Sequence, residues 1–141
     1  MANFIYSIFQ AFGFTHPFHP VLTHMVIGPI IAAFLFSLVA WIFKKPVLYK
    51  TAHQLTWLAV VFWFFTVFFG FMDWLHFYNG ELLFPIIMKL IFAGVLLPLL
   101  LTSVLIKKRL AAESKILIIF YGASLLDVLV IGYFGGALVF G

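Results

Sequence analysis

The chain of 141 residues contains five histidines, and three of them fall in one stretch, THPFHPVLTH, at His16, His19 and His24. Neutral imidazole is a common ligand for metal ions and for haem iron. A long apolar stretch follows directly, so a second interpretation is open, in which these histidines are polar groups at the mouth of a membrane helix. The two interpretations differ in whether an imidazole reaches into the protein interior.

The composition predicts that a bilayer surrounds most of the chain. Hydrophobic residues make up 66% of the sequence and charged residues 9%, whereas a soluble domain carries about 25% charged residues. The absence of cysteine excludes disulfides, iron–sulfur ligation and covalent c-type haem. The net charge of +4 does not indicate nucleic-acid binding, because seven of the eight Lys and Arg residues lie in two short segments between apolar stretches.

Four apolar stretches are long enough to cross a bilayer core about 30 Å thick, which takes about 20 residues. They are Pro20–Phe43, Thr51–Trp74, Leu83–Ile106 and Lys115–Leu138. Short connections predict an all-α membrane protein, an up-down-up-down four-helix bundle forming one domain over residues 1–141. Thr51 is expected to cap the second span, and residues 1–15 are expected to form an interfacial segment.

The basic residues predict the orientation of the spans. They lie in the first and third connections, at Lys44, Lys45, Lys50, Lys107, Lys108, Arg109 and Lys115. By the positive-inside rule both connections are cytoplasmic, so both termini face outside.

On this topology, polar side chains converge at the outer end of the bundle. His24 lies about one turn inside the first span and directly above Gly28, which leaves room for a flat, bulky group. We therefore expect His24 to reach into the bundle, while His19 and the neighbouring prolines shape the start of the helix. The alternative for His24 is a neutral imidazole that is hydrogen-bonded to a neighbouring helix.

Haem b is the cofactor that these residues favour. His24 and His76 lie on helices that are adjacent in sequence and at similar depth, as two axial ligands would. Asp73 belongs to the same group of polar side chains at the outer end of the bundle. Lys89 either neutralises haem propionates or extends outward to the interface. A divalent metal ion is the weaker alternative, because the histidine spacing matches no zinc pattern.

Two further features concern the span interiors. Asp127 lies near the bilayer midplane, so we expect it to face the bundle. There it is expected to be a protonated hydrogen-bond donor, with a place in a proton path as the less favoured alternative. Small residues four apart, Ala33–Ser37 and Gly132–Gly136, predict close helix contacts.

Three short motifs give the chain a resemblance to a known family. HPVLTH opens the first span, GFMDW closes the second, and IGYFGGALVFG ends the chain. Their order resembles small bacterial four-helix inner-membrane proteins with His-Pro and a second His on helix one, Gly-x-x-Asp ending helix two, and a Gly-Gly-x-Leu-Val ending. The matching positions are His19, Pro20, His24, Gly70, Asp73, Gly135, Gly136, Leu138 and Val139.

The resemblance covers nearly the whole chain from Thr15, and it implies a redox setting because members are sometimes fused to Rieske-type domains. Members usually carry a further histidine near the start of helix three, where this chain has Lys89. If that histidine is the second haem ligand of the family, either His76 substitutes for it here or the second ligand position is vacant.

These observations predict a haem b-binding electron-transfer protein, or a subunit of a redox complex, in the bacterial inner membrane. The alternatives are a non-catalytic structural subunit of a larger membrane complex and a divalent-metal-binding membrane protein. An enzyme is less favoured, since the sequence shows no nucleophile–base pair and no phosphate-binding loop. The expected partners are the lipid bilayer and a membrane or periplasmic redox partner, and a homo-oligomer is left open.

Overall fold

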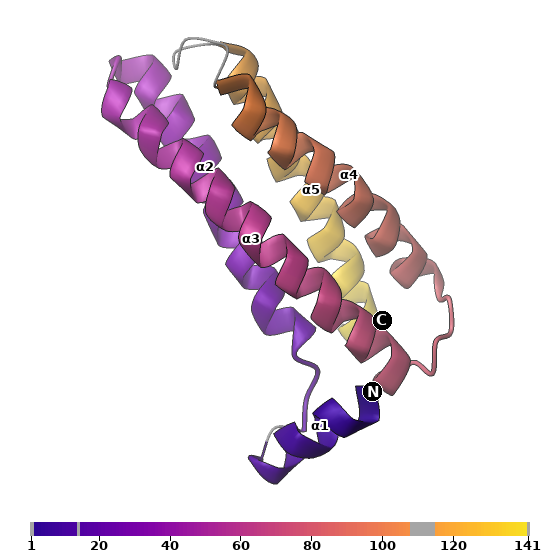
Figure 1. The fold of residues 1–141 in the computed structure, drawn as a ribbon. Helices are drawn as coiled ribbons and strands as arrows, with labels where there is room; N and C mark the ends of the chain where they lie inside the picture. Colours follow the sequence, from indigo (N-terminus) through magenta and orange to yellow (C-terminus); the bar gives the residue numbers. More distant parts are fainter. Residues whose placement is uncertain (1, 14, 108–114, 141) are drawn as a thin grey trace.

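Four long helices form an antiparallel bundle in the computed structural model, which describes residues 2–13, 15–107 and 115–140 (Figure 1). A short helix, α1, precedes them, and no strand occurs in these ranges. The bounds are α1 Ala2–Ala11, α2 His19–Phe43, α3 Pro46–Phe77, α4 Phe84–Lys107 and α5 Lys115–Phe140. All four long helices are long and apolar enough to cross a membrane, which confirms the predicted four-helix membrane bundle.

The predicted spans agree with α2, α4 and α5 to within two residues, and the difference lies in α3. This helix begins at Pro46, five residues before Thr51, so the expectation that Thr51 caps it is wrong. Proline suits the first turn of a helix, where its missing N–H would have no partner. Thr51 lies one turn inside the helix, and its hydroxyl donates to the Val47 carbonyl at 3.4 Å.

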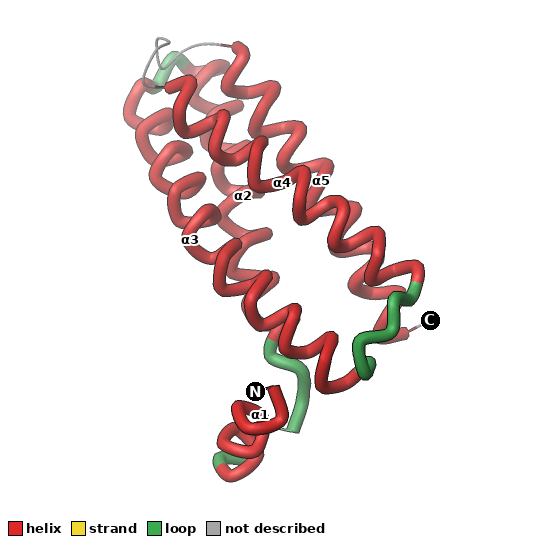
Figure 2. Tube along the Cα trace, turned by 45° about the vertical axis from the view of Figure 1, so that its right-hand side comes forward, coloured by secondary structure: helices red, strands yellow, loops and turns green. Residues whose placement is uncertain are grey.

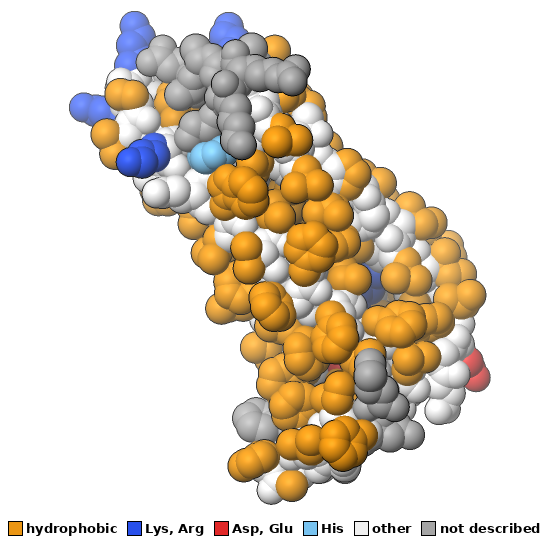
Figure 3. All heavy atoms as spheres, viewed as in Figure 1, with side chains coloured by type: hydrophobic (Ala, Val, Ile, Leu, Met, Phe, Trp, Pro, Cys, Tyr) orange, Lys and Arg blue, Asp and Glu red, His pale blue; other side chains and the backbone are white. Residues whose placement is uncertain are grey.

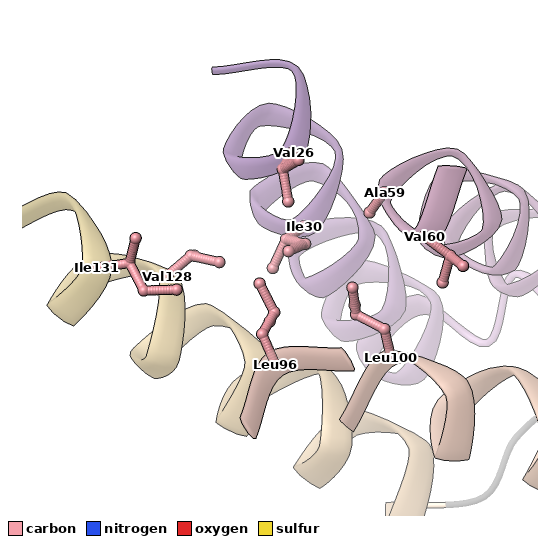
Figure 4. Close-up of a cluster of buried hydrophobic side chains, with 8 residues drawn as sticks. All are labelled: Val26, Ile30, Ala59, Val60, Leu96, Leu100, Val128 and Ile131. Atoms are coloured by element: carbon pink, nitrogen blue, oxygen red, sulfur yellow. The ribbon is translucent and has the colours of Figure 1, made fainter. Parts of the chain in front are cut away.

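Each long helix packs against its neighbours in chain order, and α5 closes the bundle against α2. The central core takes two residues from each of the four long helices, labelled in Figure 4: Val26, Ile30, Ala59, Val60, Leu96, Leu100, Val128 and Ile131. The Trp63 indole N–H donates to the Ala93 carbonyl at 3.1 Å, which joins α3 to α4. The two helical hairpins are thus held together by apolar packing and by this hydrogen bond.

The two predicted pairs of small residues differ in whether they make a close helix contact. Ala33 and Ser37 are fully buried, as the sequence predicts. Gly132 is exposed, and a Cβ at Gly132 or Gly136 would meet no described atom within 4 Å. The prediction of a close helix contact at Gly132–Gly136 is therefore wrong within this chain. The close approaches occur at Gly70 and Gly122 instead.

The two ends of the bundle differ in their polar residues. One end, here termed the lysine end, carries Lys44, Lys45 and Lys50, and Lys115 lies there over the Trp41 ring. Lys108 and Arg109 of the predicted basic connection lie outside the described residues. The opposite end, termed the histidine end, holds the start of α2, the end of α3 and the crosswise helix α1 (Figure 2).

Candidate functional site

Asp73 joins α3 to the beginning of α2. Its carboxylate is 5% exposed; Oδ2 accepts the backbone N–H of His19 at 2.9 Å, and Oδ1 accepts that of Phe18 at 3.4 Å. The first N–H groups of a helix have no partner within the helix, and a negative charge there interacts favourably with the helix dipole. Asp73 therefore caps α2 from a different helix, and α2 has no side-chain cap of its own at Phe18.

The His19 imidazole points from α2 onto α3. Its Nδ1 lies 3.0 Å from the carbonyl oxygen of Thr66. A carbonyl oxygen only accepts hydrogen bonds, so Nδ1 carries the proton in this arrangement and Nε2 of the neutral ring keeps its lone pair. The Thr66 hydroxyl in turn donates to the Leu22 carbonyl at 3.1 Å. Ring and hydroxyl form a reciprocal pair of contacts between the two helices.

Gly70 makes room for this ring. A Cβ at Gly70 would lie 2.7 Å from Nδ1 and 3.0 Å from Cε1 of His19. Real Cβ atoms essentially never approach another heavy atom closer than 3.0 Å, so only glycine allows the imidazole to pack here against the backbone of α3.

Lys89 of α4 lies near Asp73 and His19, and its side chain is directed toward α5. Its side chain is partly buried, and its ammonium lies 3.9 Å from the position that a Cβ would take at Gly135. The ammonium interacts electrostatically with Asp73 and with His19. The Lys89 side chain thus lies on the same side of the bundle as Asp73 and His19, and its role toward haem propionates stays a prediction. His19, Thr66, Asp73 and Lys89 are here termed the histidine-end cluster.

His24 does not belong to this cluster. Its side chain is exposed on the outer face of α2, and its Nδ1 lies 2.7 Å from the Pro20 carbonyl of the same helix. Gly28 beneath it is also exposed, and a Cβ there would meet nothing within 4 Å. The expectation that His24 reaches into the bundle is wrong, because a five-residue offset turns it about 140° away from His19. Of these two imidazoles of α2, that of His19 faces the interior.

His76 packs against α1. Its ring stacks on the Tyr6 ring with centroids 4.3 Å apart and an interplanar angle of 10°. His16 is exposed near the start of α2, with its Nδ1 3.2 Å from the Thr15 hydroxyl oxygen. The imidazoles of His24 and His76 therefore do not face a common space as two axial ligands would.

Two remaining predictions concern metal ions and Asp127. Among the described residues, no three His, Asp or Glu side chains gather closely enough to hold a metal ion. Asp127 is 6% exposed and lies one turn after Ser124, which is fully buried. Its Oδ2 has no hydrogen-bond partner within the described part of the chain. The carboxyl group is therefore buried in the bundle, and its protonation stays a prediction.

Thr66 was not among the residues singled out from the sequence, although a signal for it exists. It is the one hydroxyl residue in the apolar run from Leu58 to Met72, and Gly70 follows it by one turn on the same face. A polar group beside a glycine in a membrane span indicates a close contact with another helix.

The fold and the cluster together define a small multi-pass membrane protein whose four helices enclose polar side chains at one end. The chain belongs to the family described as Predicted membrane protein (DUF2231), whose model matches residues 15–141. This match confirms the family resemblance drawn from the motifs. Comparison with curated proteins found no match, and comparison with solved structures found none either.

Proposed function

We propose that this protein is a membrane subunit of a bacterial redox complex and that His19, rather than His24, is its ligand for haem b. The observation that carries the proposal is the hydrogen bond between His19 Nδ1 and the Thr66 carbonyl at 3.0 Å. Histidines that ligate metals usually donate the other ring N–H to a carbonyl or a carboxylate, which fixes the tautomer and aims the free nitrogen.

Among the described residues, His19 would supply one imidazole to a haem, and the pair expected from the sequence would not. His19 offers Nε2, whereas His24 lies outside the bundle and His76 lies under α1. Lys89 supports an anionic group beside His19, because an ammonium can neutralise a carboxylate such as a haem propionate. When bound, haem supplies one-electron transfer, and the chain's own residues orient the imidazole and balance charge.

Absorption spectra test the proposal directly. The protein, purified in mild detergent, should show a b-type band in the reduced-minus-oxidised spectrum. His19→Ala should abolish that band, because the imidazole proposed as the haem ligand is lost. His24→Ala is the matched control: it removes an exposed imidazole of the same helix and should leave the band unchanged. Loss of the band in His24→Ala but not in His19→Ala would contradict the assignment of the ligand. Wild-type protein that contains no haem after gentle purification would refute the proposal of haem binding.

A structural subunit is the second candidate, and a separate observation favours it. Both oxygens of Asp73 and the Nδ1 of His19 are occupied in contacts between α2 and α3. Polar side chains used in this way fix the register of two helices without any cofactor. On this alternative His19→Ala lowers the stability of the bundle, while the purified wild-type protein has no b-type spectrum. The divalent-metal alternative gains no support from the described side chains.

A further inference from the structure

Helix α1 lies across the histidine end and shows two apolar stripes. One stripe faces the bundle: Tyr6 is 1% exposed and packs on Met72 and His76, with Ile5 beside it. Phe9 extends this stripe by stacking on Phe18 with ring centroids 4.7 Å apart. The inner stripe therefore attaches α1 to α3 and to the segment that leads into α2.

The second stripe is exposed. Phe4 is 69% exposed, Ile8 follows one turn later, and Phe12 is 77% exposed in the turn after the helix. Residues four apart lie on one face of a helix. Ser7 and Gln10, which are also exposed, lie on the remaining side of α1. The helix thus presents one side to the protein, one apolar side and one polar side.

The position of α1 and its lack of charged side chains indicate what covers its exposed apolar stripe. In Figure 3 the apolar side chains over α1 adjoin those of the membrane-spanning helices. The first 18 residues contain no Asp, Glu, Lys or Arg, so neither an acidic nor a basic partner is selected by charge. Helix α1 contacts the end of α3 at His76 and Phe77 and the segment before α2 at Phe18. It thus lies at the end of the spans, where a bilayer would give way to water.

We propose that α1 lies in the membrane–water interface, with Phe4, Ile8 and Phe12 inserted into the lipid leaflet at the histidine end. An amphipathic helix in this position buries its apolar face about 5–10 Å deep, at the boundary of headgroups and acyl chains. The insertion depends on apolar contact and aromatic rings rather than on anionic lipid, because the segment carries no basic side chain. Tyr6 meanwhile keeps the helix against the bundle.

Site-directed spin labelling of the full chain tests this placement, since the chain has no cysteine to remove. Ile8→Cys places a nitroxide on the exposed apolar stripe, and Gln10→Cys is the matched control two residues away on the polar side. Both variants are reconstituted into vesicles of phosphatidylcholine alone. The label at position 8 should collide severalfold more often with oxygen, which concentrates in lipid, than with a water-soluble nickel chelate. The label at position 10 should show the reverse preference.

Two results would overturn the proposal. Equal, high accessibility of both labels to the nickel chelate would mean that α1 stands in water. Protection of the label at position 8 from both reagents would mean that protein, such as a second copy of the chain, covers the stripe. Phe4→Cys provides a second site on the same stripe, so that a folding defect of Ile8→Cys does not leave the placement untested.

Discussion

Replacing Gly70 by alanine inserts a methyl group where the His19 ring now lies. The new Cβ would be 2.7 Å from Nδ1, and ordinary contacts begin at 3.4 Å, so the ring has to move by about 0.7 Å (3.4 − 2.7). Such a movement strains or breaks the 3.0 Å hydrogen bond to Thr66. We therefore expect Gly70→Ala to weaken the contact between α2 and α3.

The size of the effect follows from three contributions. Overpacking costs about 1–3 kcal/mol, and a lost hydrogen bond costs about 0.5–1.5 kcal/mol. Alanine in place of a helical glycine stabilises by about 0.5–1 kcal/mol. The expected net decrease in the free energy of unfolding is about 2 kcal/mol. Unfolding by sodium dodecyl sulfate in mixed micelles, followed by circular dichroism, measures this decrease.

A matched glycine and a double-mutant cycle make the measurement specific. At Gly94, in α4, a Cβ would meet no atom of the described residues within 4 Å, so Gly94→Ala should not destabilise the protein. In the background of His19→Ala the clashing ring is absent, and Gly70→Ala should then stabilise the protein by about 0.5–1 kcal/mol. The expected coupling energy is therefore about 3 kcal/mol, whereas independent sites add to within about 0.5 kcal/mol. Additive effects of the two substitutions would refute the steric reasoning.

Three further predictions concern the other polar and charged residues. Asp73→Asn removes the charge and one acceptor from the start of α2, so the free energy of unfolding should fall by about 1–2 kcal/mol in the same assay; an unchanged value would mean that water caps the helix equally well. Asp127→Asn should preserve folding while Asp127→Lys should not, because a neutral donor suits the buried position and a cation does not; circular dichroism and gel filtration decide, and tolerance of the lysine would contradict the prediction. Reporter fusions after Lys45 should be active in the cytoplasm and fusions at Asn79 outside it; cytoplasmic activity at Asn79 would invert the orientation.

The fold could be predicted because the signals for membrane spans are long and redundant. Each span needs only about 20 apolar residues between polar ends, and prolines at the beginning of α2 and α4 mark the boundaries. At the beginning of α3, Pro46 is a stronger signal for a first helical turn than Thr51 is for a cap, so the predicted start lies too late. The burial of Asp127 was predictable from the cost of a polar group in lipid.

The orientation of the histidines of α2 was harder to predict from the sequence, because this helix has two stripes of small residues. One passes through His24, Gly28 and Ala32, and the other through Ala33 and Ser37. The buried residues Val26, Ile30, Ala33 and Ser37 follow one another at three- and four-residue steps, and the same steps lead back to His19. His24 lies two residues before Val26, about 200° around the helix, and the choice between the stripes depends on packing against α3.

The contacts of Lys89 and His76 could not be predicted from the sequence, because each depends on packing against another helix. A lysine near a helix start has two favourable environments, the interface and a carboxylate inside the bundle. Which of them it adopts depends on Asp73, which lies on another helix. His76 depends likewise on α1, whose docking through Tyr6 is a tertiary contact without a short-range sequence pattern.

The cap that Asp73 provides for α2 also bears on how the chain is made and inserted. Asp73 follows His19 by 54 residues, so the ribosome synthesises all of α2 and most of α3 before the acceptor for the first amides of α2 exists. During that interval those two amides depend on water at the membrane surface. Arrival of Asp73 at the histidine end then removes that dependence and fixes α2 against α3. The start of α2 is therefore complete only in the α2–α3 hairpin, and neither helix alone carries the full set of contacts seen at this end.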